Sequence, residues 1–157
     1  MRLEYFQLID RIVDLKLADR KIVTEATVPT TSTIFEGHFP GFPLMPGVLL
    51  IEAMAQTSGW LIVAANRFER MAFLAAVKDA KFRMFVTPGH KLSVKASLDH
   101  EGSGYAVTRA TIAFDGKPIC DATLTLRVLD FPNAEMKLRM REAAARVGFP
   151  TEVCANG

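Results

Sequence analysis

A glutamate and a histidine draw attention in this 157-residue sequence, because their surroundings suit acid–base chemistry. Glu52 interrupts an apolar run, between the residues LLI at 49–51 and Ala53. An unpaired carboxylate is expensive to bury in such a run, so Glu52 is either a structural ion-pair or capping residue or a functional acid. His38 lies fourteen residues earlier in the loop FEGHFP at 35–40, between a glycine and an aromatic–proline pair that limit its freedom.

The two residues together indicate a reaction that needs both a base and an acid. A neutral imidazole held in an apolar loop can act as general base, and a protonated carboxyl can act as general acid, at neutral pH. A lone histidine in a loop is usually only solvated. His90 and His100 lie in turn or strand-end contexts without such neighbours, and we interpret them as surface residues.

A long buried helix is predicted to carry Glu52. Pro46 suits the first position of a helix, where its missing N–H is not needed, and Gly47 permits the close approach of another group. Residues 48–66 are apolar almost all round, which is typical of a helix enclosed by other elements. Residues 30–47, rich in glycine and proline, are expected to form an irregular loop.

The enclosing elements are predicted to be strands. Alternating and β-branched residues bounded by turn signals predict strands at 21–28, 72–77, 81–86, 91–98, 105–114 and 118–129, whereas residues 8–17 fit either a helix or a strand. We expect the last three strands to form an antiparallel meander. The predicted fold class is therefore α+β, a hot-dog fold in which a curved antiparallel sheet is wrapped around a long central helix.

An extra C-terminal helix is predicted at 135–147. Apolar residues recur there at helical spacing, at Met136, Met140, Ala143, Ala144 and Val147, which indicates an amphipathic helix. We expect residues 1–131 to form the hot-dog domain, and residues 132–157 to form a C-terminal helical extension and tail of the same domain.

Composition excludes several classes of partner and location. Nineteen Lys and Arg against seventeen Asp and Glu give a charge of +2, too near balance for a general nucleic-acid binder. Cys120 and Cys154 lack the spacing of a zinc site or a disulfide framework, so we expect no metal and a reducing, cytoplasmic location. The N-terminus lacks the pattern of a secretion signal, and Glu52 within the apolar run argues against a membrane span.

A family resemblance is carried by residues 35–56, FEGHFPGFPLMPGVLLIEAMAQ. This stretch resembles the signature of the β-hydroxyacyl-acyl carrier protein dehydratases, most closely the FabZ type. The similarity continues through DAKFR at 79–83 and VTPG at 86–89, and covers roughly residues 5–129. The resemblance implies a hot-dog fold and an obligatory homodimer with active sites at the subunit interface, often assembled as a hexamer, a trimer of dimers.

The same resemblance implies a reaction and its catalytic residues. The residue corresponding to His38 removes a proton from C2 of a (3R)-3-hydroxyacyl thioester bound to acyl carrier protein. The residue corresponding to Glu52, from the partner subunit, assists departure of the C3 hydroxyl as water and leaves the trans-2-enoyl thioester. This hydro-lyase belongs to fatty acid or lipid biosynthesis and needs no cofactor. Glutamate at this position, where the FabA type has aspartate, favours dehydration without isomerisation.

Other residues are expected to support this chemistry. The backbone N–H of Gly47 is our candidate donor to the thioester oxygen, because unpaired N–H groups at a helix N-terminus favour negative charge. Gln56, one turn after Glu52, is close enough to hydrogen-bond the carboxyl, unless it is an ordinary amide facing the dimer partner. Phe39 and Pro46 are expected to shape the loop and the acyl tunnel.

Charge suggests where the carrier protein docks. Between residues 78 and 95, five Lys and Arg stand against one Asp, which is either a docking rim for an acidic carrier or ordinary solvated strand faces. We interpret Trp60 as core, and the C-terminal helix either packs across the oligomer or discriminates between carriers. The alternative functions are a hot-dog thioesterase or hydratase, and a non-catalytic acyl-thioester binding module.

Overall fold

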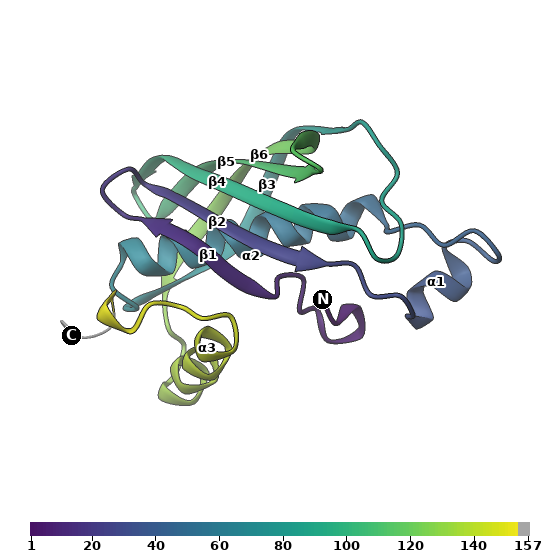
Figure 1. Ribbon diagram of the computed structural model, residues 1–157. Coiled ribbons are helices and arrows are strands. Elements are labelled where there is room, and N and C mark those ends of the chain that lie inside the picture. The colour runs from purple at the N-terminus through teal and green to yellow at the C-terminus, as the bar shows by residue number, and fades with distance from the viewer. Residues whose placement is uncertain (154–157) are drawn as a thin grey trace.

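The computed structural model describes residues 1–153 and consists of a curved antiparallel sheet around one long helix (Figure 1). The sheet has six strands in the order β1-β2-β4-β5-β6-β3, so β1 and β3 are its edges. This architecture confirms the predicted hot-dog fold. The strands are β1 (Arg11–Lys16), β2 (Lys21–Thr27), β3 (Arg70–Phe82), β4 (Lys91–Gly102), β5 (Tyr105–Phe114) and β6 (Lys117–Asp130). The helices are α1 (Thr33–Gly37), α2 (Gly47–Ala65) and α3 (Ala134–Arg146), with short 3-10 turns at Leu3–Tyr5 and Thr151–Val153.

The central helix α2 is the predicted buried helix. Twelve of its nineteen residues are buried, and by length and composition alone it is apolar enough to cross a bilayer. However, 67% of that apolar window lies inside the protein, as in the core helix of any enclosed fold. The helix starts one residue later than predicted. Pro46 is the N-cap, with a ψ of 133° that keeps it out of the helix, and its carbonyl accepts from Leu49 N–H at 3.0 Å.

The predicted irregular loop at 30–47 contains a short helix that the sequence analysis did not anticipate. Ser32 caps α1 by accepting a hydrogen bond from Ile34 N–H at 3.1 Å. This cap satisfies one of the free N–H groups at the start of α1. The glycines and prolines that predicted an irregular loop begin at Gly37, the last residue of this helix, and the others follow it.

Two strand assignments are corrected or decided by the structure. The predicted strands at 72–77 and 81–86 form one strand, β3, which continues through a register shift near Asp79, where φ is 54°. Residues 83–86 lie outside it. The ambiguous segment 8–17 contains the edge strand β1, because it pairs with β2. The predicted meander is confirmed, since β4, β5 and β6 are consecutive neighbours in the sheet.

Two buried hydroxyl pairs join α2 to the sheet. Thr24 on β2 and Thr57 on α2 are both fully buried, with their hydroxyl oxygens 2.8 Å apart. Thr108 on β5 donates to the hydroxyl of Ser58 at 2.8 Å. Because buried hydroxyl groups need hydrogen-bond partners, these pairs fix both the rotation and the position of α2 along the sheet.

The C-terminal helix α3 is present, one residue earlier than predicted, and it is attached to the core. Ala144 and Val147 are buried, and the Val147 carbonyl accepts from Ile12 N–H at 2.8 Å. Phe149 packs against Trp60 and Phe68, with ring centroids 5.5 Å apart in each pair. The division at residue 131 stays a prediction, but α3 contributes to the same core cluster as the sheet.

The hydroxyl pair at Thr57 generates an asymmetric prediction for stability. Thr57 donates its one hydroxyl hydrogen to the Ala53 carbonyl at 2.9 Å, so Thr24 must be the donor to Thr57. Thr57→Val therefore leaves the Thr24 hydroxyl without a partner and should cost about 1 to 3 kcal/mol in the free energy of unfolding. Thr24→Val leaves Thr57 bonded to Ala53 and should cost less. Urea denaturation of both variants and the double variant measures this, and a larger loss from Thr24→Val contradicts the assignment.

Candidate active site

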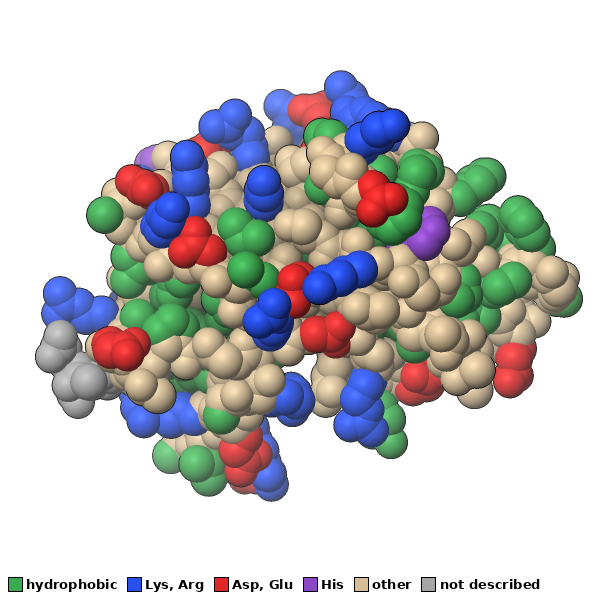
Figure 2. Space-filling model, in the orientation of Figure 1, with side chains coloured by type: hydrophobic (Ala, Val, Ile, Leu, Met, Phe, Trp, Pro, Cys, Tyr) green, Lys and Arg blue, Asp and Glu red, His purple; other side chains and the backbone are tan. Residues whose placement is uncertain are grey.

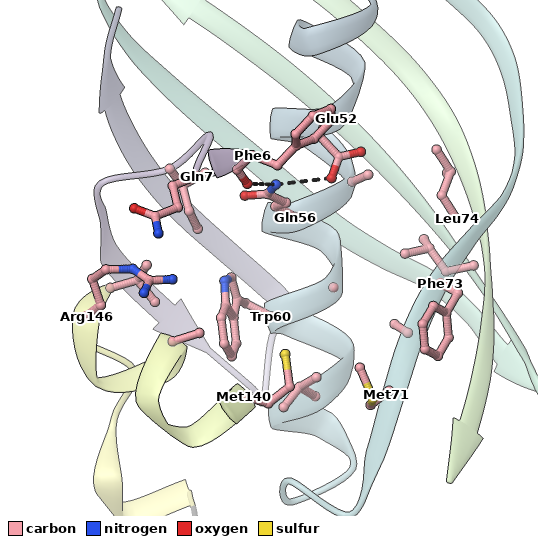
Figure 3. A pocket seen from close by; sticks show the side chains of 18 residues that line it. Phe6, Gln7, Glu52, Gln56, Trp60, Met71, Phe73, Leu74, Met140 and Arg146 are labelled. Atoms are coloured by element: carbon pink, nitrogen blue, oxygen red, sulfur yellow. Dashed lines mark hydrogen bonds between the residues drawn. The ribbon is translucent and has the colours of Figure 1, made fainter. Parts of the chain in front are cut away.

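The side chain of Gln56 holds Glu52 in place on α2 (Figure 3). Its Nε2 group donates to the Glu52 Oε1 atom at 3.0 Å and to the Phe6 carbonyl at 2.7 Å, while its Oε1 atom accepts from Leu8 N–H at 3.2 Å. The amide is thus anchored to the N-terminal segment and presents one hydrogen to the carboxyl. Glu52 is half-buried, less enclosed than its apolar neighbours in sequence suggested.

His38 ends α1 with a defined ring orientation. Its Nδ1 atom lies 2.9 Å from the Leu44 carbonyl oxygen, and its ring stacks on Phe39 with centroids 4.3 Å apart. The backbone of His38 is also held, donating to the Ile34 carbonyl at 3.0 Å and accepting from Leu44 N–H at 2.8 Å. Because a carbonyl only accepts, Nδ1 carries the hydrogen in this contact, and the lone pair of a neutral ring is then on Nε2.

The N-terminal segment holds α1 through Glu4. The Glu4 carboxylate accepts from the Ser32 hydroxyl at 2.6 Å and from Thr33 N–H at 3.0 Å. These hydrogen bonds, with that of Ser32 the strongest, lower the pKa of Glu4 from 4.5 to about 2. Residues 1–8 therefore support both candidate groups indirectly: Glu4 binds the start of the helix that ends at His38, and the backbone at Phe6 and Leu8 binds Gln56.

Gly47 begins α2 beside the ring of Phe82, the last residue of β3. A Cβ atom at Gly47 would lie 3.1 Å from the Phe82 Cε1 atom, so only glycine leaves this approach unhindered. The first N–H groups of a helix have no partner within it. Among the described residues no acceptor bonds the N–H of Gly47, which leaves it free for a ligand. Pro46 precedes it as the N-cap, and Phe39 is half exposed.

A cavity of about 370 Å³ begins at Glu52 and Gln56 and runs along α2 (Figure 3). Its other walls come from residues 6, 7 and 9 of the N-terminal segment, from β3, from Leu126 on β6, and from α3 with its C-cap Val147. His38 and Gly47 do not line it, so a single chain does not bring the predicted base and acid into one cavity. The sequence analysis missed the contributions of β3 and α3 and took Trp60 as core only. The amphipathic pattern of α3 was the available signal, but nothing in it specified which element its apolar face would meet.

Exposed apolar side chains surround the candidate residues and follow the edge strand β3. Val48 is 71% exposed and Phe85 is 72% exposed. On β3 the exposed apolar side chains are Phe73, Leu74, Val77 and Phe82. An open edge strand with apolar side chains is a surface for pairing with another chain, and a large apolar patch is normally covered.

The basic segment at 78–95 does not form one continuous surface. Lys78 and Lys81 lie on β3, whereas Lys91 and Lys95 lie on β4, and strands β5 and β6 separate the two. Two of the five cations already have acidic partners, since Arg83 pairs with Asp121 and Lys91 lies 3.6 Å from Glu25. Figure 2 shows basic side chains distributed among acidic ones over the visible face.

The structure describes one of the two cysteines. Cys120 is a buried free thiol. Burial raises the pKa of this thiol from 9.0 to about 11, so it is unreactive at neutral pH. Cys154 lies outside the part of the chain that the structure describes.

Comparisons with known proteins agree on one family. Residues 2–123 match the FabA-like domain, which leaves α3 outside the match. The 3-hydroxyacyl-acyl-carrier-protein dehydratase FabZ of Ligilactobacillus salivarius is 37% identical over 122 residues, covering 77% of this chain and 86% of that protein.

Solved structures of low identity share the fold. The dehydratase heterocomplex ApeI:P from Xenorhabdus doucetiae has a TM-score of 0.61 at 17% identity, covering 87% of this chain and 90% of that one. A hypothetical thioesterase with coenzyme A from Streptococcus pneumoniae has a TM-score of 0.58 at 18% identity, covering 78% and 88%. Because both dehydratases and thioesterases have this fold, the activity must be argued from the site.

The hydrogen bonds of Glu4 predict a pH dependence of stability. The folded pKa of Glu4, about 2, is below its ordinary value of 4.5, so its contribution is fully present above pH 4.5 and is lost as pH falls toward 2. Glu4→Gln should therefore lower the unfolding midpoint at neutral pH, and the difference from wild type should shrink steadily below pH 4.5. Thermal unfolding monitored by circular dichroism across this range checks the sign. A difference that stays constant with pH contradicts it.

Proposed function

The chain belongs to the FabA-like family, with FabZ dehydratases as relatives over most of its length, and we propose that His38, Glu52 and Gly47 catalyse its reaction. The function is dehydration of 3-hydroxyacyl-acyl carrier protein in fatty acid biosynthesis. We propose the (3R)-3-hydroxyacyl thioester as substrate and the trans-2-enoyl thioester as product. No cofactor is needed for this elimination, because the acid, the base and the oxyanion donor are all protein groups.

The proposed steps balance in atoms and charge. The Nε2 atom of His38 takes the proton from C2, and the electrons of that C–H bond form the C2–C3 double bond as the C3–O bond breaks. Glu52, in its protonated form, gives its proton to the leaving hydroxyl, which departs as water. The imidazolium then loses its proton and the carboxylate regains one, so both groups return to their starting state.

The observation that carries this proposal is the hydrogen bond from His38 to Leu44. It assigns the hydrogen to Nδ1 and leaves Nε2 as the basic atom, in a ring that the Phe39 stack holds in one orientation. A general base must present its lone pair to the proton that it removes. An untethered loop histidine would have to be ordered at each turnover, at a cost in entropy.

Glu52 is proposed to act on the substrate held by the other subunit. Within one chain the acid lines the α2 cavity and the base does not, which supports a site completed by a second copy. The apolar edge strand β3 is the proposed dimer surface, because pairing of two such edges covers both the free backbone groups and the exposed side chains. Assembly into a trimer of dimers stays a prediction.

Gly47 and Gln56 are proposed as supporting groups. The free N–H of Gly47 would donate to the thioester oxygen as negative charge develops there, an interaction worth about 3 to 4 kcal/mol of transition-state stabilisation in comparable sites. Gln56 is a positioning residue, since it bonds Glu52 and two backbone groups of the N-terminal segment. Phe39 would orient the His38 ring, and Pro46 would fix where α2 begins.

Docking of the carrier protein is proposed at the β3 end of the basic segment. Lys78 and Lys81 are exposed and have no acidic partner among residues 1–153, and they lie near Phe82, which contacts the start of α2. Unpaired cations beside a site favour an acidic partner and speed its association. We also propose a cytoplasmic location, supported by the free thiol of Cys120.

The assigned roles predict the kinetics of two single variants. His38→Ala and Glu52→Gln should each lower kcat about 10²- to 10⁴-fold, because each removes one proton-transfer group, while the fold is kept. Mass spectrometry of the acyl carrier products identifies the reaction as loss of one water. Unchanged turnover in either variant contradicts the role of that residue, and release of free acid by the wild type would instead identify a thioesterase.

A site shared between subunits predicts complementation. When inactive His38→Ala and Glu52→Gln chains are mixed and refolded together, each mixed dimer contains one site with both residues intact. Random pairing should restore about a quarter of wild-type activity, since half of the dimers are mixed and half of their sites are complete. Native mass spectrometry confirms that mixed dimers have formed. If they form without recovery of activity, base and acid come from the same chain.

A further inference from the structure

The helix α3 occupies a place that the family relationship does not explain. It lies beyond residue 123, where the FabA-like match ends, yet it lines the same cavity as Glu52. The lining residues of α3 are Met140, Ala143 and Arg146, and its C-cap Val147 follows them. Met140, Ala143 and Val147 recur at helical spacing and so share one apolar face. Arg146 is the charged residue of α3 at the cavity, whereas Lys137 does not line it and bonds Glu69 at 2.9 Å.

This wall is held firmly to the fold. The Val147 carbonyl accepts from Ile12 N–H on β1, and Phe149 packs against both Trp60 and Phe68. A helix fixed at its C-terminal end by a strand and by aromatic packing presents a constant surface to a ligand. Trp60 lies on α2 and itself lines the cavity, so the packing of Phe149 joins the α3 wall to the α2 wall.

The cavity is polar at the end of Glu52 and Gln56, and apart from Gln7 and Arg146 the rest of its lining is apolar or glycine. Glu52 and Gln56 lie at one end, whereas Trp60, Met71 and Met140 line parts further along (Figure 3). From Glu52 to Val63 the helix advances about 16 Å, at 1.5 Å per residue. A volume of about 370 Å³ falls within the range of small-molecule sites.

We propose that α3 forms the distal wall of the acyl pocket, and that Met140 and Ala143 determine which acyl chain lengths the enzyme dehydrates. This inference rests on the proposed function. Glu52 acts at the C3 hydroxyl, so the carbons beyond C3 continue from Glu52 into the apolar cavity of the subunit that supplies the acid. The occupant is therefore the hydrocarbon tail of the substrate, and α3 of the acid-donating subunit contacts its far end.

Substitutions that change the wall should change the preference for chain length. Ala143→Leu fills space in the cavity, and Met140→Ala opens it. The measured quantity is the ratio of kcat/KM for 3-hydroxydodecanoyl carrier to that for 3-hydroxybutanoyl carrier. Ala143→Leu should lower this ratio at least about tenfold, and Met140→Ala should raise it, because pocket contacts with methylene groups discriminate to this extent.

Met136→Ala is the matched control. Met136 is also a methionine of α3, one turn before Met140, but it is 40% exposed and does not line the cavity. It should leave the ratio unchanged. If Ala143→Leu lowers both substrates equally, or if Met136→Ala shifts the ratio as much as Met140→Ala, then α3 acts through packing and the proposal is overturned.

A photochemical probe separates this proposal from the catalytic one. A 3-hydroxyacyl pantetheine with a diazirine at its terminal carbon should label peptides of α3, both in the wild type and in the Glu52→Gln variant, because tail binding does not need turnover. Labelling of the sheet or of other segments, and never of α3, would overturn the pocket assignment. Failure of the catalytic assignment would appear separately, as retained turnover in His38→Ala or Glu52→Gln.

Discussion

The hydroxyl pairs between α2 and the sheet determine which residues of the central helix can do chemistry. A helix that is apolar almost all round has little preference for one rotation, because every face can be buried. Thr57 and Ser58 remove this freedom, since each accepts a hydrogen bond from a buried hydroxyl on a particular strand. With that rotation fixed, Glu52 and Gln56 face the cavity, while Ala53 and Met54 pack into the core.

The N-terminal segment links the two catalytic candidates. It has little regular structure beyond one 3-10 turn, but its backbone binds the amide of Gln56 and its Glu4 carboxylate binds the start of α1. A carboxyl and an imidazole that are each oriented by hydrogen bonds need less reorganisation when the substrate binds. In the proposed mechanism the segment contributes through geometry, without supplying a reacting group.

The chain has a segment that matches the family and a C-terminal helix that lies outside the match, and the two have different proposed roles. The match over residues 2–123 includes His38, Glu52 and Gly47, the residues proposed as base, acid and oxyanion donor. The contribution of α3 lies outside it and consists of Met140, Ala143 and Arg146, none of which is proposed to react. If both proposals hold, reaction type and substrate range are encoded in separate segments, and the second can vary without disturbing the first.

The sequence alone determined the elements and the chemical candidates. Periodicity identified α2, α3 and the β4–β5–β6 meander, because local alternation of apolar residues depends only on which side faces a core. Periodicity did not identify the strands whose extent depends on pairing with another strand. The segment 8–17 contains a strand because it pairs with β2. The two predicted strands on either side of Asp79 form one strand, because the pairing with β6 continues past an irregularity there.

Only the tertiary structure decided which side chains meet. The amide of Gln56 bonds Glu52 and also Phe6, fifty residues away in sequence, and the ring of His38 is oriented by the Leu44 carbonyl. It also decided that the apolar face of α3 closes the cavity beside α2. Such contacts depend on how separate elements pack, and no spacing along the chain specifies a distance between residues that are far apart in it.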